Sequence, residues 1–262
     1  MKKISRRSFL AAAAVSAAAL ALTACGGSAS TASSAAASSV AASSEAASTS
    51  AAAAELTTVE AGKLTMATNA TFPPYEMTTD AGTIEGIDVD TAQAIAEKLG
   101  LELQIDDMDF DAALLSVQQG KADIAMAGIT VTDERMAVMS FSDSYATGIQ
   151  SVIVPEGSDI ASVDDLAGKK IGTQRGTTGY LYCSDDFGED AVVAYDNGLT
   201  AVQALNNGQV DAVVIDNEPA KAYVESNPGL KILDTSYAEE DYAIGMNKSN
   251  TALLEAVNAA LE

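Results

Sequence analysis

An arginine and an aspartate at predicted strand ends could together hold a small dipolar molecule. Arg135 lies in the first turn of a predicted helix that follows the apolar run 124–127. A cation is unfavourable there because the helix macrodipole is positive at its N-terminus. A guanidinium kept at such a position, beside backbone N–H groups and Thr130, indicates a fork for a carboxylate. The alternative interpretation is a salt bridge to Asp133 or Glu134.

Two features further along the chain supply complementary groups. Asp216 ends an apolar run, where a lone carboxylate needs a cation or several donors to stay ionised. The glycine-rich loop 175–179 precedes a predicted helix from Tyr180, and free N–H groups at a helix start can bind an anion. The alternatives are that Asp216 caps the next helix together with Asn217, and that the loop is an ordinary turn with threonine capping.

The combination suits a small zwitterion, whose carboxylate would bind Arg135 and whose ammonium group would bind Asp216. The chain lacks the residues and motifs that several other kinds of chemistry need. The chain contains no histidine, which excludes serine or cysteine nucleophiles activated by histidine and the commonest zinc ligands. Neither a phosphate-binding loop of the Walker type nor a dinucleotide-binding glycine motif occurs. We therefore expect no catalytic residues, no metal and no cofactor.

The elements that must position these groups alternate between strand and helix from Lys63 onward, which predicts an α/β sheet. Apolar residues at helical spacing predict a helix over 92–99 that Gly100 ends. Strands are predicted at 64–67, 101–105, 124–127, 170–173 and 213–215. Asp111 is predicted to cap a helix that Gly120 ends.

A similar unit occurs twice, 88 residues apart. Segment 116–123 and the strand after it resemble segment 204–211 and the strand after that, with glycine, aspartate and apolar residues in the same order. The offset places Gly128 opposite Asp216, each just beyond the C-terminal end of a strand. Ligands of open α/β sheets bind at that edge. The repeat therefore predicts two lobes that face each other across a cleft.

The first 24 residues are typical of an export signal. Basic residues precede an apolar segment, 9–22, that is shorter than the ~20 residues a membrane-spanning helix needs. The motif LTAC at 22–25 resembles a lipobox, so Cys25 is predicted to carry lipid, palmitate included. The alternative is an ordinary signal with a chance cysteine. The motif SRRSFL at 5–10 resembles a twin-arginine signal, and the general secretion route stays equally open.

Charge and composition limit the partners of the mature chain. The signal contains four basic and no acidic residues, so ten basic residues remain against 37 acidic ones. Such a negative chain is not expected to bind nucleic acid or anionic lipid, which leaves the lipid as its only tie to a membrane. Residues 26–54 are almost entirely Ser, Ala, Thr and Gly and are predicted to form a disordered tether. Cys183 then has no disulfide partner and is expected to be buried.

The chain resembles the family 3 solute-binding proteins, which capture polar amino acids for ABC importers. The resemblance extends over residues 62–258. Its motifs are ATNATFPPYE at 67–76, GIDVD at 86–90, MDF at 108–110, AGITVTDER at 127–135, FSD at 141–143, SVDDLAGK at 162–169, GTT at 176–178 and VDAV at 210–213.

The resemblance implies a type II periplasmic-binding-protein fold, with two α/β lobes joined by two crossovers near 145–151 and 240–244 that close by hinge motion. The expected division is a signal peptide at 1–24, lipidated Cys25 and tether at 25–55, a first lobe at 56–146, a second lobe at 147–242 and a return to the first lobe at 243–262. The family normally continues past the helix at 253–261 with a further helical segment. This chain stops at Glu262, so either the first lobe is trimmed or the sequence is incomplete.

The resemblance also implies roles for single residues. Arg135, Thr130 and the backbone of Thr177 and Thr178 match positions that hold the α-carboxylate, and Asp216 and the Gly128 carbonyl match those that hold the α-ammonium. The side-chain pocket is expected to consist of Asn69, Phe72, Phe110 and Gln174. Many relatives carry aspartate at the position of Asn69, often those that select cationic side chains. A neutral Asn69 therefore favours a neutral polar ligand such as glutamine or cystine.

The sequence thus predicts a monomeric, extracytoplasmic lipoprotein that delivers an amino acid to an ABC transporter permease. Two alternative functions stay open. An enzyme on the same fold, similar to cyclohexadienyl dehydratase, would need a cleft carboxylate with a raised pKa as general acid, and Glu76 is the candidate. A sensory or adhesive surface domain is the other.

Overall fold

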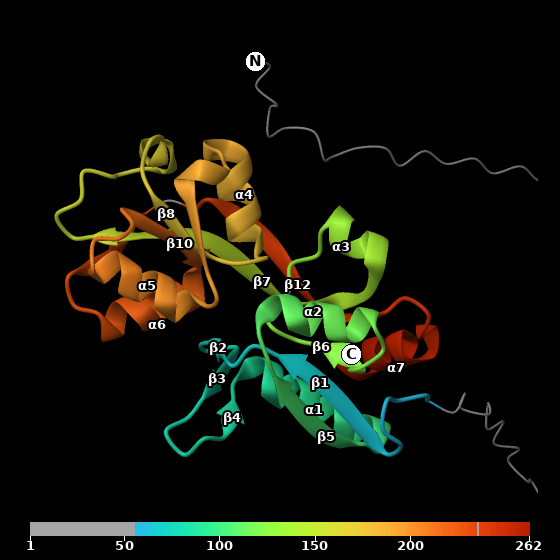
Figure 1. Ribbon diagram of the computed structural model, residues 1–262. Coiled ribbons are helices and arrows are strands. Elements are labelled where there is room, and N and C mark those ends of the chain that lie inside the picture. The colour runs from blue at the N-terminus through green and yellow to red at the C-terminus, as the bar shows by residue number, and fades with distance from the viewer. Residues whose placement is uncertain (1–55, 235) are drawn as a thin grey trace, which may run out of the picture. The chain divides into compact units, whose positions relative to one another are not determined.

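A nine-stranded sheet runs through residues 56–262 apart from residue 235, the part of the chain that the computed structural model describes (Figure 1). Its strands are β1 (Lys63–Thr68), β5 (Glu102–Asp107), β6 (Ile124–Ala125), β7 (Met139–Pro155), β8 (Ile171–Gln174), β9 (Val192–Tyr195), β10 (Ala212–Asp216), β11 (Leu230–Ile232) and β12 (Ala238–Asn247). They are arranged in the order β5-β1-β6-β12-β7-β10-β8-β9, and β11 pairs with β7. The predicted signal peptide, Cys25 and tether lie outside the described residues.

Helices pack on this sheet, and a small separate sheet accompanies it. The helices are α1 (Ile87–Leu99), α2 (Phe110–Gln118), α3 (Asp133–Val138), α4 (Thr178–Phe187), α5 (Gly198–Asn206), α6 (Asn217–Ser226) and α7 (Thr251–Leu261), with short 3-10 turns η1 (Val163–Leu166) and η2 (Glu189–Ala191). The small sheet consists of β2 (Thr71–Phe72), β3 (Glu76–Thr78) and β4 (Ile84–Glu85). No helix in residues 56–262, with 235 set aside, is both long and apolar enough to cross a membrane.

Alternation along the strands explains the core of the first half, by which we mean residues 56–146 and 243–262. Successive side chains of a strand point to opposite faces of the sheet. Leu64 and Met66 accordingly pack with α1 and α7 on one face, whereas Ala67 packs with α2 on the other. Helices therefore cover both faces of β1, as is usual for parallel strands.

The second half, residues 147–242, is built in the same way. Val213 and Ile215 of β10 belong to a core cluster with residues of α5 and α6. Ala212 and Val214 belong to a second cluster that includes Cys183 of α4. Cys183 is fully buried, as its apolar surroundings require, and it forms no disulfide.

Two long antiparallel strands connect the halves. Strands β7 and β12 pair along most of their length, with register shifts around Ala243. Both predicted crossovers, 145–151 and 240–244, fall inside this one ribbon. The sheet therefore continues from one half into the other, with parallel strands on either side: β1 with β5 and β6, and β8 with β9 and β10.

Two local predictions need correction. Asp111 does not cap a helix: α2 begins at Phe110, and Asp109 occupies the N-cap position without a side-chain hydrogen bond. The strand predicted at 124–127 is shorter, because β6 ends at Ala125. The backbone beyond it turns toward Gly128, which adopts a φ of 54°.

Candidate functional site

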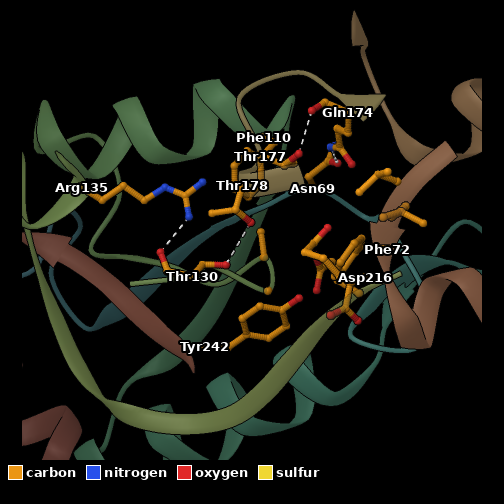
Figure 2. Close-up of a pocket in the computed structure, with 16 residues that line it drawn as sticks. Asn69, Phe72, Phe110, Thr130, Arg135, Gln174, Thr177, Thr178, Asp216 and Tyr242 are labelled. Carbon is orange, nitrogen blue, oxygen red and sulfur yellow. Dashed lines mark hydrogen bonds between the residues drawn. The ribbon is translucent and has the colours of Figure 1, made fainter. Parts of the chain in front are cut away.

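A cavity between the two halves brings the predicted ligand-binding residues together (Figure 2). It encloses about 450 Å³ of free space, part of which opens to solvent. All ten residues chosen from the sequence line it: Asn69, Phe72, Phe110, Gly128, Thr130, Arg135, Gln174, Thr177, Thr178 and Asp216. The structure thereby places these residues at one site, while their roles in binding remain predictions.

Arg135 enters the cavity from α3, whose N-cap Thr132 accepts a hydrogen bond from the Arg135 backbone N–H. Its side chain is 8% exposed, and its guanidinium carbon lies 5.3 Å from the centre of the Phe110 ring. One guanidinium nitrogen donates to the Thr130 carbonyl at 2.7 Å, and the other donates to the Gly176 carbonyl of the second half at 3.1 Å. The guanidinium is thus fixed by neutral acceptors and by an aromatic face.

The alternative salt bridge of Arg135 to Asp133 or Glu134 is wrong. No ion pair of Arg135 occurs within residues 56–262, residue 235 excluded. Both acidic side chains are exposed, whereas the guanidinium is buried. Burial lowers the pKa of Arg135, and acidic groups led by Glu240 oppose this effect. A buried guanidinium with neutral partners is well suited to receive an anion.

The start of α4 lies beside Arg135 and offers backbone donors. Thr177 is its N-cap, and the Thr177 hydroxyl accepts from the Tyr180 N–H at 3.4 Å. Thr178 opens the helix, and its hydroxyl lies 3.4 Å from that of Thr130 in the first half. The first N–H groups of a helix have no partner inside the helix, so this end can bind an anion.

Asp216 lies on the opposite side of the cavity, near Tyr242 and Phe72 in Figure 2. It is 1% exposed, accepts from the Ile149 N–H at 2.8 Å and caps α6 through the Glu218 N–H at 3.1 Å. Burial raises its pKa, whereas hydrogen bonds from Tyr242 and from the two backbone groups lower it. The predicted cap is therefore confirmed, and the same carboxylate faces the cavity without an ion-pair partner in the described chain.

The space around Gly128 leaves no room for a side chain. A Cβ at this residue would lie 2.7 Å from the Phe72 ring and 3.2 Å from the Tyr242 ring. Its positive φ of 54° also belongs to the left-handed region, which favours glycine. Gly128 therefore brings backbone close to the cavity between two aromatic rings.

Asn69 and Gln174 join the halves at the other end of the cavity. The Gln174 amide donates to the Asn69 side-chain oxygen at 2.9 Å, and the Asn69 amide donates to the Met108 carbonyl at 2.9 Å. Asn69 therefore acts as both acceptor and donor, which an ionised aspartate cannot do. Asn69 is 6% and Gln174 is 4% exposed.

Asp111 of the first half lies close to Gly176 of the second half. Gly176 has a φ of 74°, and a Cβ there would lie 1.7 Å from a carboxylate oxygen of Asp111. The positive φ favours glycine at this residue, and the exposed Asp111 carboxylate would have to move to admit a side chain.

Six further lining residues escaped prediction as ligand-binding residues: Glu76, Ala127, Gln150, Val214, Ile215 and Tyr242. Tyr242 and Gln150 come from β12 and β7, whose pairing joins segments about 90 residues apart, and no local pattern indicates it. Glu76 is the last residue of the motif at 67–76 that supplied Asn69 and Phe72, so its place in that motif was the available signal. The described residues contain no group of acidic or cysteine side chains that could hold a metal ion.

Comparison with known proteins identifies similar chains. The model of the bacterial extracellular solute-binding proteins, family 3, matches residues 64–262. A probable histidine-binding protein of Neisseria gonorrhoeae is 34% identical over 203 residues, 75% of this chain and 76% of that protein. The L-cystine-binding protein TcyJ of Escherichia coli K12 is 31% identical over 206 residues, 77% of each chain.

Solved structures agree. An ancestral arginine-binding protein is similar in its arginine-bound form (43% identity, TM-score 0.73) and in its glutamine-bound form (42% identity, TM-score 0.72). Both matches cover 76% of this chain, with 91% of the arginine-bound chain and 90% of the glutamine-bound chain. The predicted type II periplasmic-binding-protein fold is thereby confirmed. These relatives are named as binding proteins and not as enzymes.

Proposed function

The chain belongs to the bacterial extracellular solute-binding proteins of family 3, and from this premise we propose that it captures a free amino acid between Arg135 and Asp216 and delivers it to an ABC transporter permease. It is an extracytoplasmic amino-acid-binding protein of ABC transport, and not an enzyme. The observation that supports the proposed site is the pair of buried, oppositely charged groups on one cavity, each without an ion-pair partner in the described residues.

The α-carboxylate would lie between the guanidinium, the Thr130 hydroxyl and the start of α4. Arg135 can add a charge-assisted contact because its present acceptors are neutral carbonyls. The backbone of Thr177 and Thr178 supplies donors at the positive end of the helix dipole. These groups come from both halves, so the carboxylate would tie the halves together.

The α-ammonium would bind the Asp216 carboxylate and the Gly128 carbonyl. Burial deprives the Asp216 carboxylate of its hydration, and an ammonium group bound to it would compensate for this loss. Tyr242 and Phe72 enclose this end of the cavity, where they exclude water and strengthen the interaction.

For the ligand side chain, we propose the polar amino acids, with glutamine and cystine as the neutral candidates. The amides of Asn69 and Gln174 present neutral groups, and Phe72 and Phe110 present apolar surface. A relative that binds L-cystine and a similar structure with bound glutamine support this choice. The similar structure with bound arginine indicates that a basic side chain also deserves a direct test.

A thermal-shift screen of the twenty common amino acids, cystine and ornithine tests the proposal. A ligand that binds only the folded state stabilises it by about 2.7 kcal/mol at one hundred times its Kd. At least one polar amino acid should raise the melting temperature of the wild type and leave that of Arg135→Ala unchanged. Absence of any shift in the wild type would contradict the proposed function.

We further propose that Cys25 carries the lipid that holds a monomeric chain at the outer face of the membrane. Cys25→Ser should then move the protein from the membrane fraction to the released fraction. Cys183→Ser is the matched control, because Cys183 is buried in the core of the second half. Equal membrane association of Cys25→Ser and wild type would contradict the anchor, and sedimentation of the released protein tests the monomer.

A further inference from the structure

Two carboxyl groups are fully buried at the wall of the cavity. Glu76 of β3 lines the cavity, and Asp88 lies in the first turn of α1; both are 0% exposed. One oxygen of Asp88 accepts from the Gly128 N–H at 3.1 Å and from the Tyr145 hydroxyl at 2.9 Å. Asp88 thus holds the backbone of the residue expected to meet the ligand ammonium.

The remaining three carboxyl oxygens are buried without a hydrogen-bond partner among the described residues. No N–H or O–H group of the described chain donates to either oxygen of Glu76 or to the second oxygen of Asp88. The Asp88 backbone N–H donates to the carbonyl of Tyr75, the residue before Glu76, at 2.9 Å, which brings the two buried carboxyl groups side by side. Two carboxylates cannot both be ionised at such a site, whereas one proton between them forms a hydrogen bond and halves the charge.

Glu76 is the member that carries the proton. Two donors stabilise the ionised form of Asp88, and none stabilises the ionised form of Glu76. Burial raises the pKa of Glu76 well above its ordinary value, and the neighbouring Asp88 raises it further. Burial also raises the pKa of Asp88 to about 6, and hydrogen bonds from Gly128 and Tyr145 oppose the shift.

Among the described residues that line the cavity with Glu76, the one cation is Arg135, which forms no ion pair with either carboxyl group. The ionisable groups that act on Glu76 or Asp88 are Asp107 of β5 and Tyr145 of β7, and the charge of Glu76 acts in turn on Tyr75 and on Tyr223 of α6. All are acidic or neutral. No lysine or arginine of the described residues forms an ion pair with either carboxyl group.

We propose that Glu76 and Asp88 share one exchangeable proton, and that this pair lets the cavity accept either a neutral polar or a basic amino acid. A neutral side chain leaves the proton in place. A basic side chain brings its own charge, Glu76 ionises, and the proton passes to solvent. The inference rests on the proposed function and specifies the substrate class of the same site. A similar ancestral arginine-binding protein has been solved with arginine bound and with glutamine bound.

Calorimetry with arginine and glutamine as probes tests the exchange. Titrations at pH 7 in two buffers of different ionisation enthalpy give the number of protons released per bound ligand. The wild type should bind both ligands and release close to one proton with arginine and none with glutamine. Glu76→Gln, which keeps a donor to Asp88, should abolish the release and weaken arginine binding at least tenfold more than glutamine binding. Glu85→Gln, at an exposed glutamate of the neighbouring strand β4, is the matched control and should behave as wild type.

The remaining outcomes separate this inference from the proposed function. Arginine binding without proton release, or release that persists in Glu76→Gln, overturns the shared proton as the source. Binding of glutamine alone overturns the dual substrate class. If no amino acid binds, the proposed function fails, and infrared spectra of the free protein then test the pair. A protonated-carboxyl band that Glu76→Gln removes supports the shared proton, and its absence from the wild type overturns it.

Discussion

Helix α2 of the first half and helix α5 of the second half each contain nine residues, and they begin 88 residues apart. Gly120 and Gly208, which follow them, both adopt a φ of 67°. Asp123 then accepts from the Thr65 N–H at 2.8 Å, and Asp211 accepts from the Lys170 N–H at 2.7 Å. Strands β6 and β10 each run parallel to the first strand of their half. The unit of helix, glycine, aspartate and strand is therefore duplicated in the two halves.

The duplication ends where the strands meet the cavity. The first half presents the backbone of Gly128 and, seven residues later, the guanidinium of Arg135. The second half presents the carboxylate of Asp216 at the position equivalent to Gly128. A symmetric scaffold thus carries an asymmetric set of charges, which is what a dipolar ligand requires. The difference teaches that the repeat determines where the groups lie and that a few substitutions determine what they bind.

The largest expected loss of amino-acid affinity comes from removing the Arg135 guanidinium. Arg135→Ala should weaken amino-acid binding by about 3 to 5 kcal/mol, because a buried carboxylate would lose a bidentate, charge-assisted partner. Isothermal titration calorimetry with the amino acid found in the screen measures the loss. Arg135→Lys should recover only part of it, since an ammonium group lacks the planar fork. Affinity near that of wild type in Arg135→Ala would remove the arginine from the proposed site.

The opposite charge tests the other half. Asp216→Asn should weaken binding by about 2 to 3 kcal/mol, because the ligand ammonium would lose its counter-charge. The fold should survive: the change removes one acceptor for the Ile149 or Glu218 N–H but also removes a carboxylate whose burial is costly. Calorimetry of binding and thermal unfolding without ligand separate the two effects. A large loss of melting temperature would show that the carboxylate serves the fold instead of the ligand.

The same comparison shows how far the sequence could be interpreted. The repeat was predictable because glycine stops, an aspartate and an apolar run recur in order, and Asp216 ends the second of these runs. Tyr242 and Gln150 were not, because they reach the cavity through the pairing of β7 with β12 across about 90 residues. Asp111 was misjudged as a cap because capping residues are common in loops; it instead contacts Gly176 of the other half, which only the tertiary structure reveals.

The carboxyl group that holds Gly128 in the first half and the one beside it should make the free energy of unfolding depend on pH. Gly128 is held by Asp88, which faces Glu76, and burial raises the pKa of that glutamate above its unfolded value. The folded state then binds more protons than the unfolded state, so the free energy of unfolding falls as pH rises from about 4.5 through the raised pKa of Glu76. Glu76→Gln lacks this titration and should lose less stability between pH 4.5 and 7, by about 1 to 2 kcal/mol. Chemical denaturation across this range measures both proteins, and parallel curves would contradict the shift.

The smallest expected effect tests the duplication itself. Gly120 and Gly208 have the same φ, and a Cβ at either residue would meet no atom within 4 Å. Alanine at each should therefore cost only the backbone strain of the left-handed region, about 1 kcal/mol. Gly120→Ala and Gly208→Ala should lower the free energy of unfolding equally and leave amino-acid affinity unchanged, because neither residue lines the cavity. Unequal losses in denaturant unfolding would mean that the two halves contribute unequally to the free energy of unfolding, although their helices end alike. The repeat would then extend to the geometry of the two halves but not to their stability.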